Sequence, residues 1–161
     1  MIEQLQVLLH ILLAMGLGGI VGYEREQADK PAGLRTHMLV AGAAALLTTL
    51  GNIVVGAIRT EDVHLTTDPI RILEAIVTAV GFLGAGTIMR QRDGTQIEGL
   101  TTAASLLLTA GVGIGVGLRQ YVLAIGVVIL TLLVLRSVKI FVVEKINEDV
   151  LHERPPAKNG P

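Results

Sequence analysis

The sequence contains no cysteine and little of what a catalytic or metal site requires. The absence of cysteine from the 161 residues excludes disulfides, thiol nucleophiles and cysteine-based metal sites. The four histidines occur singly and form no HxxxH or HExxH pair, so a zinc site finds no support. A Walker motif, a catalytic triad and a metalloprotease helix are also missing. We therefore predict a protein that is not an enzyme and has no resident cofactor.

Charge is scarce as well. Only 17% of the residues are charged and the formal net charge is -1, whereas a nucleic-acid-binding protein needs a basic surplus to neutralise phosphates. Apolar residues make up 51% of the chain and the mean hydropathy is +0.63. This composition lies outside the range of ordinary soluble domains, so the lipid bilayer is the predicted solvent.

Five apolar runs separate the charged segments. They cover Leu5–Tyr23, Met38–Ile58, Ile70–Met89, Leu100–Leu118 and Tyr121–Leu135. The fifth run begins almost directly after the fourth, so a tight turn is expected between them. The last run gives only about 22 Å of helix against a hydrocarbon core of about 30 Å, so we expect it to extend towards Val143. Arg136 and Lys139 would then lie on one face and reach up to the headgroups. The prediction is an all-α membrane protein with five transmembrane helices over residues 1–143 and a polar cytoplasmic tail over 144–161.

The distribution of lysine and arginine predicts the orientation. With five spans, one side of the membrane carries Arg59, Arg71 and Arg119. The other side carries Arg25, Lys30, Arg35, Arg90, Arg92, Arg136, Lys139, Lys145, Arg154 and Lys158. Since the side richer in positive charge faces the cytoplasm, the N-terminus is expected outside and the C-terminus in the cytoplasm.

The first and second pairs of spans share a short pattern. Residues 19–22 (GIVG) and 33–36 (GLRT) correspond to residues 81–84 (GFLG) and 99–102 (GLTT). Both units place GxxG on the descending helix and GLxT at the start of the returning one. The pattern predicts a parallel repeat of helices 1–2 and 3–4, with helix 5 as an extra element. Two similar hairpins without a common origin remain the alternative.

Glycines recur at spacings that favour close helix packing. GxxxG pairs are formed by Gly18 with Gly22, Gly111 with Gly115 and Gly113 with Gly117. Such pairs let helix backbones approach one another, within the bundle or in a homo-oligomer. The segment GFLGAG places Gly81, Gly84 and Gly86 near the middle of the third span. These glycines permit either tight packing or a broken helix whose carbonyl groups bind a substrate.

Charged residues near the span ends offer two further kinds of site. In the segment from Glu24 to His37, the carboxylates of Glu24, Glu26 and Asp29 can bind hydrated Mg²⁺. Alternatively, Arg35 and the N-termini of spans two and four can hold an anion such as phosphate.

On the opposite side, Asp68 before Pro69 is expected to cap the third span. Arg71 and Glu74 follow at a spacing of three, either as an ion pair or as a site for an external cation.

Three segments together resemble the MgtC/SapB family of bacterial inner-membrane proteins. They are GLGGIVGYEREQADKPAGLRTHMLVAGAAALLTTLG, DPIRILEAIVTAVGFLGAGTIM and GLTTAASLLLTAGVGIGVGL, and the likeness covers residues 5–143. The resemblance implies a five-helix inner-membrane domain linked to growth in low magnesium and, in pathogens, to survival inside macrophages. It also implies partners among membrane complexes, notably the F-type ATP synthase. Longer members carry a soluble C-terminal domain resembling an ACT fold, so we expect a short form here.

The resemblance and the charge pattern together give the candidate functional residues. These are Glu24, Arg25, Glu26, Arg35, Thr36, Asp68, Arg71, Glu74, Gly81, Gly84, Gly86, Thr101 and Thr102. The first hypothesis is a non-enzymatic protein that supports adaptation to low magnesium by modulating other membrane complexes. The second is a small transporter or channel for Mg²⁺ or another ion. A third is a module that only oligomerises through its glycine faces.

Overall fold

A computed structural model describes residues 2–59, 70–90 and 97–152, and these residues are almost entirely helical. The helices are α1 (Ile2–Gln27), α2 (Leu34–Arg59), α3 (Ile70–Thr87), α4 (Leu100–Gly117) and α5 (Tyr121–His152). Between α3 and α4, β1 (Met89–Arg90) and β2 (Ile97–Glu98) form a short antiparallel pair with Met89 opposite Glu98. The predicted all-α class with five helices is confirmed for the part of the chain that the structure describes. Asp68 lies outside the described residues.

Four of the helices are long and apolar enough to cross a membrane: α1, α2 as far as Ala57, α3 and α4. The apolar part of α5, Tyr121–Arg136, is shorter and gives about 24 Å of helix at 1.5 Å per residue. The chain is therefore a multi-pass membrane protein. The expected tight turn between the last two helices is present, since α4 ends at Gly117 and α5 begins at Tyr121.

Two helix boundaries differ from the prediction. α1 continues through Gln27 and α2 begins at Leu34, so the predicted charged loop from Glu24 to His37 is wrong and the connection is only residues 28–33. Glutamate, arginine and glutamine are good helix formers, so a change from apolar to charged residues need not end a helix. Similarly, α5 continues to His152 and takes up the first part of the predicted polar tail.

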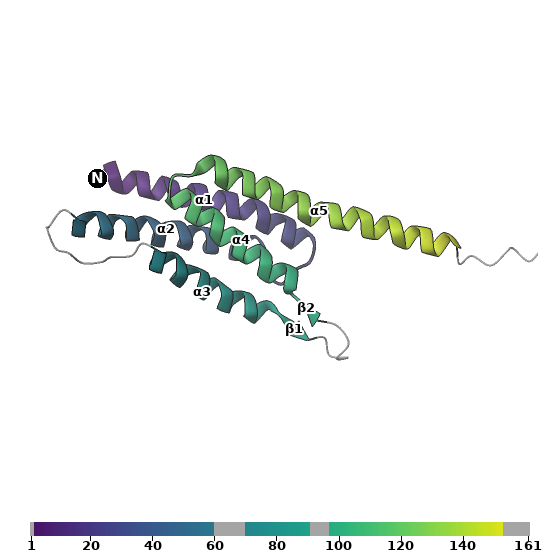
Figure 1. Ribbon diagram of the computed structural model, residues 1–161. Coiled ribbons are helices and arrows are strands. Elements are labelled where there is room, and N and C mark those ends of the chain that lie inside the picture. Colours follow the sequence, from purple (N-terminus) through teal and green to yellow (C-terminus); the bar gives the residue numbers. More distant parts are fainter. Residues whose placement is uncertain (1, 60–69, 91–96, 153–161) are drawn as a thin grey trace, which may run out of the picture.

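α4 lies at the centre of the bundle and contacts all four other helices (Figure 1). α3 packs mainly on α4 and α2, and α5 packs on α4 and α1. The α1–α2 connection, the β1–β2 pair and the far end of α5 lie at one end of the bundle (Figure 1). The N-terminus and the α4–α5 turn lie at the other end, where the Tyr121 hydroxyl is 2.7 Å from Nε2 of His10 on α1.

Glycines bring α1 and α4 into close contact with α2. A Cβ atom on Gly18 of α1 would lie 2.6 Å from the His37 carbonyl oxygen, which is too close for any other residue. On α4, a Cβ on Gly117 would lie 2.9 Å from Cβ of Thr48, and Gly113 likewise has no room beside Ala41. These contacts are the small-residue interfaces that hold helices together where lipid provides no hydrophobic driving force.

The remaining glycines of α4 are less restricted. Gly115 makes only an ordinary contact, with a would-be Cβ 3.5 Å from Cβ of Ala124. Gly111 is exposed, and a Cβ there would meet nothing within 4 Å. Within this bundle Gly111 therefore has no packing role, because it lies on the outer face of α4.

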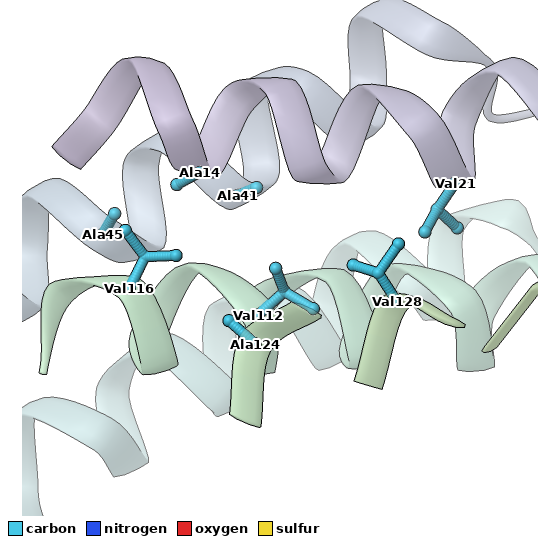
Figure 2. Close-up of a cluster of buried hydrophobic side chains, with 8 residues drawn as sticks. All are labelled: Ala14, Val21, Ala41, Ala45, Val112, Val116, Ala124 and Val128. Atoms are coloured by element: carbon cyan, nitrogen blue, oxygen red, sulfur yellow. The ribbon is translucent and has the colours of Figure 1, made fainter. Parts of the chain in front are cut away.

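Two apolar clusters fill the interior between the helices. The first joins α1, α2, α4 and α5 (Figure 2) and consists of Ala14, Val21, Ala41, Ala45, Val112, Val116, Ala124 and Val128. The second joins α2, α3 and α4, together with the α1–α2 connection, and consists of Ala32, Val40, Ala44, Ile76, Val80, Leu106 and Ala110. Alanine and valine dominate both clusters, as expected where the helix axes lie close together.

The two hairpins repeat one contact. In the first, a Cβ on Gly22 would lie 2.8 Å from Cβ of His37; in the second, a Cβ on Gly84 would lie 3.3 Å from Cβ of Ala103. His37 and Ala103 each follow the glycine of GLxT by four residues. The second glycine of GxxG thus faces the same position of the returning helix in both units, which is consistent with the predicted repeat.

Candidate functional site

Five polar side chains are buried at the end of the bundle that contains the two hairpin connections. Glu24 and Arg25 come from the last turns of α1, His37 from the first turn of α2, and Thr102 and Ser105 from the start of α4. We refer to these five residues as the buried polar cluster. The solvent-exposed fraction of each whole residue is 7% or less, which is unusual for charged residues unless they are paired.

His37 is fully buried and links α2 to α4. Its Nε2 lies 3.1 Å from Oγ of Ser105, and its Nδ1 lies 3.0 Å from the Gly33 carbonyl oxygen. α1 closely approaches the backbone of His37 at Gly18 and its Cβ at Gly22. His37 therefore lies where three helices meet.

The hydrogen bonds of His37 allow two protonation states without movement of any heavy atom. A carbonyl oxygen can only accept a hydrogen bond, so Nδ1 must carry a proton and donate a hydrogen bond to the Gly33 carbonyl oxygen in both states. In the neutral state, the Ser105 hydroxyl donates to Nε2. In the protonated state, Nε2 donates to Ser105, whose hydroxyl then donates to the Thr102 carbonyl oxygen at 2.8 Å. Rotation of one hydroxyl is enough to accommodate a proton.

Glu24 and Arg25 form a buried ion pair beside this histidine. Nε of Arg25 lies 3.0 Å from Oε2 of Glu24, with side-chain exposures of 5% and 8%, and both charges act on the His37 ring. Arg25 continues the buried stripe of α1 formed by Ala14, Gly18 and Val21, which explains why a guanidinium group is inside. Among the described residues, nothing accepts a hydrogen bond from its Nη1.

Thr102 completes the cluster with a second unused group. Its side chain is 1% exposed, and no partner for its hydroxyl occurs in the described part of the chain. Thr102 lies in the first turn of α4. The residue directly before this helix is Gly99, whose φ of 92° lies in the left-handed region. The buried polar cluster can therefore form hydrogen bonds beyond those observed.

The three carboxylates predicted to bind hydrated Mg²⁺ do not converge on one point among the described residues. Glu24 is paired with Arg25, and Oε2 of Glu26 accepts a hydrogen bond from the Leu34 amide at 2.8 Å. Asp29 is exposed in the connection with φ of 55°, and no group of three acidic or histidine side chains converges within the described ranges.

The alternative anion site at the start of α2 is already filled by the chain itself. The carboxylate of Glu26 occupies that helix N-terminus, while Arg35 and Thr36 point outwards and are exposed. Thr101 at the start of α4 is exposed as well.

Two of the charged residues predicted on the outer side, Arg71 and Glu74, do not interact with each other. Arg71 and Glu74 are both exposed at the start of α3, and no ion pair joins them in the described structure, so the ion-pair interpretation is wrong. The hydroxyl of Thr78 donates to the Glu74 carbonyl oxygen at 2.7 Å, an ordinary helix contact. Asp68, the third outer candidate, cannot be placed because it lies outside the described residues.

The GFLGAG segment forms continuous helix. α3 runs through it to Thr87, so the interpretation as a broken helix is wrong. Gly84 packs against Ala103, whereas Gly81 and Gly86 face outwards with nothing within 4 Å of a would-be Cβ. The helix is kept intact because its backbone has no alternative hydrogen-bond partners in lipid.

Sequence reasoning missed His37 and Ser105. The histidines were set aside because none is paired in sequence, and Ser105 lies in a run of small residues. A signal was nevertheless present: His37, Ala41, Ala44 and Thr48 recur at helical spacing, and a histidine on a stripe of small residues is expected to be buried with polar partners.

Comparison with known proteins gives a consistent result. Residues 11–143 match the sequence profile described as MgtC family. "Putative magnesium transporter YhiD" of Escherichia coli (strain K12) is 38% identical over 130 residues, which are 81% of this chain and 59% of that protein. "Protein MgtC" of Salmonella typhimurium (strain LT2) is 40% identical over 125 residues, which are 78% of this chain and 49% of that protein. The chain thus spans between 49% and 59% of these two relatives. No solved structure matches.

Proposed function

This chain belongs to the MgtC family, and on that premise we propose that it supports adaptation to low magnesium by modulating other complexes of the bacterial inner membrane. The printed name of the Escherichia coli relative mentions magnesium, which supports a magnesium-related role for a multi-pass membrane protein. The N-terminus is proposed to lie outside and the C-terminus in the cytoplasm. The F-type ATP synthase is the partner that the family resemblance suggests.

The observation that carries this proposal is the closed interior of the bundle. Two apolar clusters, the first of which is shown in Figure 2, lie between the five helices, and α1, α2 and α4 approach one another closely at Gly18, Gly113 and Gly117. Ion pathways through membrane proteins are lined by polar or ionisable groups or by water-filled cavities. In the described part of the chain, the buried charged residues lie at one end only.

The outer faces of the bundle supply the surface that a modulator needs. Phe82 on α3 is 81% exposed and Val122 on α5 is 87% exposed, so these faces are open to lipid or to a partner helix. The buried polar cluster, in contrast, has little contact with solvent. In this proposal the cluster determines how the two hairpins and α4 are held relative to one another.

The alternative is a small transporter for Mg²⁺ or another ion, and the printed name of the Escherichia coli relative favours it. Purified protein in proteoliposomes with an internal Mg²⁺-sensitive dye separates the two functions. We expect no uptake above that of empty liposomes. Uptake that is abolished by Asp68→Asn together with Arg71→Gln would refute modulation and establish a transporter.

A second experiment tests modulation itself. Membrane vesicles from cells grown in low Mg²⁺ are assayed for ATP hydrolysis by the F-type ATP synthase, with and without the protein. We expect the protein to change this activity and Phe82→Ala to reduce the change without loss of protein from the membrane. Ala79→Ser on the same helix is the control, since Ala79 is small and exposed. Equal activity with and without the protein would exclude this partner.

A further inference from the structure

A groove runs along the outside of the bundle between α1, α2 and α5. It has a volume of about 370 Å³, within the range of about 300–1,000 Å³ that is typical of ligand sites. Most of its length is apolar and is lined by Met15, Gly16, Ile20, Met38 and Leu132. Gly16 contributes to the open space, because a Cβ there would meet nothing within 4 Å. The groove is thus wide enough at this point for an alkyl chain.

One end of the groove is polar. Tyr23, Glu24 and Arg136 line it there. Arg136 is the first charged residue of α5 after Tyr121, and Tyr23 lies in the last turns of α1, so we expect this end of the groove at the level of the lipid headgroups. An apolar channel that ends in polar groups at this depth matches the shape of a phospholipid.

The charges at the polar end favour a phosphate group. The Glu24 carboxylate is already neutralised by Arg25 at 3.0 Å. Arg136 is exposed, and within the described ranges it forms no ion pair. Its guanidinium group is therefore the uncompensated charge of the groove, and the hydroxyl of Tyr23, which lines the same groove, can donate a hydrogen bond. Arginine binds phosphate oxygens through two parallel N–H groups.

We infer that this groove binds one anionic phospholipid, with an acyl chain between α1 and α5 and its phosphate at Arg136. The site is separate from the buried polar cluster, although Glu24 belongs to both. It would fix α5, which contacts only α1 and α4 closely, to the first hairpin. The inference depends on the membrane location of the chain and not on whether the protein modulates or transports.

Native mass spectrometry of delipidated protein tests the site with two lipids of identical acyl chains, phosphatidylglycerol and phosphatidylcholine. We expect one phosphatidylglycerol to be bound in preference to phosphatidylcholine. Arg136→Gln should weaken phosphatidylglycerol binding by roughly threefold to tenfold, the effect of one ordinary hydrogen bond at an exposed site. It should weaken phosphatidylcholine binding less, because the choline cation of that lipid already compensates its phosphate. Gly16→Leu fills the groove and should weaken the binding of both lipids.

Two matched variants serve as controls. Arg119→Gln removes the same charge from the opposite end of the bundle, and Gly111→Leu adds the same side chain at an equally open glycine of α4. Both should bind lipid as the unchanged protein does. Equal losses for Arg136→Gln and Arg119→Gln would show a general effect of charge and overturn the inference. Unchanged binding in Gly16→Leu would overturn it too, because the acyl chain would then lie elsewhere.

Discussion

His37 shows how a single side chain can join elements that are distant in the sequence. Its imidazole contacts Gly33 in the connection before α2 and Ser105 in α4, 68 residues further on. Both partners are needed, because a ring nitrogen buried without a hydrogen bond is destabilising. The stability of the hairpin end of the bundle should therefore depend on small polar groups as well as on apolar contacts.

Replacing Ser105 by alanine tests this dependence. We expect Ser105→Ala to lower the free energy of unfolding by about 1 kcal/mol, since Nε2 of His37 loses its partner inside the protein. Denaturant titration of the protein in detergent micelles measures the change. Thr78→Ala removes an exposed hydroxyl from α3 and should have almost no effect. Equal stability of the two variants would mean that the His37–Ser105 contact contributes nothing.

The Glu24–Arg25 pair predicts strong coupling between two neighbouring residues. Arg25→Met and Glu24→Gln should each lower the free energy of unfolding by about 3 kcal/mol, because each leaves an uncompensated buried charge. The double variant should lose much less than the sum of these two effects. A double-mutant cycle measured by the same titration gives the coupling. Additive effects would show that the two side chains do not act as a pair.

At the level of helices, glycines decide which faces meet. The faces of α1 and α4 that carry Gly18, Gly113 and Gly117 press against α2, whereas the faces that carry Gly16 and Gly111 are open. Glycines of the same helix thus have opposite roles. Those that face α2 allow close packing, and those that face away from it do not contribute to packing.

A matched pair of substitutions exploits this difference. Gly18→Leu should lower the free energy of unfolding by about 3 kcal/mol or prevent folding, because the side chain would collide with the backbone of α2 at His37. Gly111→Leu should be tolerated, since its side chain extends into lipid. The yield of folded protein after purification and its thermal unfolding temperature report the effect. Destabilisation of both variants to the same degree would contradict the observed packing of α1 on α2.

The apolar runs were enough to predict five helices, their order and the tight turn before Tyr121. They failed at Glu24–Gln27 and beyond Val143, because charged residues with high helix propensity can continue a helix without any change of geometry. GxxxG spacing identified the packing of Gly18 and Gly113, whereas Gly111 is not packed within this bundle. Spacing defines a face of a helix, whereas only the other helices decide which face is covered.

The buried polar cluster was predicted only in part. Glu24, Arg25 and Thr102 were among the candidates, while His37 and Ser105 were not. The contact between His37 and Ser105 depends on the packing of α2 on α4, and no local sequence pattern predicts a contact between residues 68 positions apart. The charges on the opposite side, Arg71 and Glu74, were candidates because they are charged, yet they lie exposed and apart.

For the whole molecule, the absence of cysteine makes the proposed orientation directly testable. Single cysteines introduced at Arg35, in the first turn of α2, and at Arg119, in the α4–α5 turn, lie at opposite ends of the bundle. In intact cells, a membrane-impermeant maleimide should label Arg119→Cys and leave Arg35→Cys unlabelled until the membrane is opened. Gly111→Cys, within the lipid-facing part of α4, should remain unlabelled in both conditions. The reverse pattern for the first two positions would invert the orientation.

The central position of α4 also has a consequence for the order of assembly. α1 and α2 are made first, and their paired glycine faces can dock at once, but Ser105 and several of the apolar partners of α2 belong to α4. At a synthesis rate of about 5–20 residues per second, α4 is complete roughly 3–12 s after α2. During that interval the first hairpin must reside in the bilayer while Nε2 of His37 still lacks its hydrogen-bond partner, the Ser105 hydroxyl. The newly inserted hairpin is therefore a metastable intermediate, and the arrival of the fourth helix completes it.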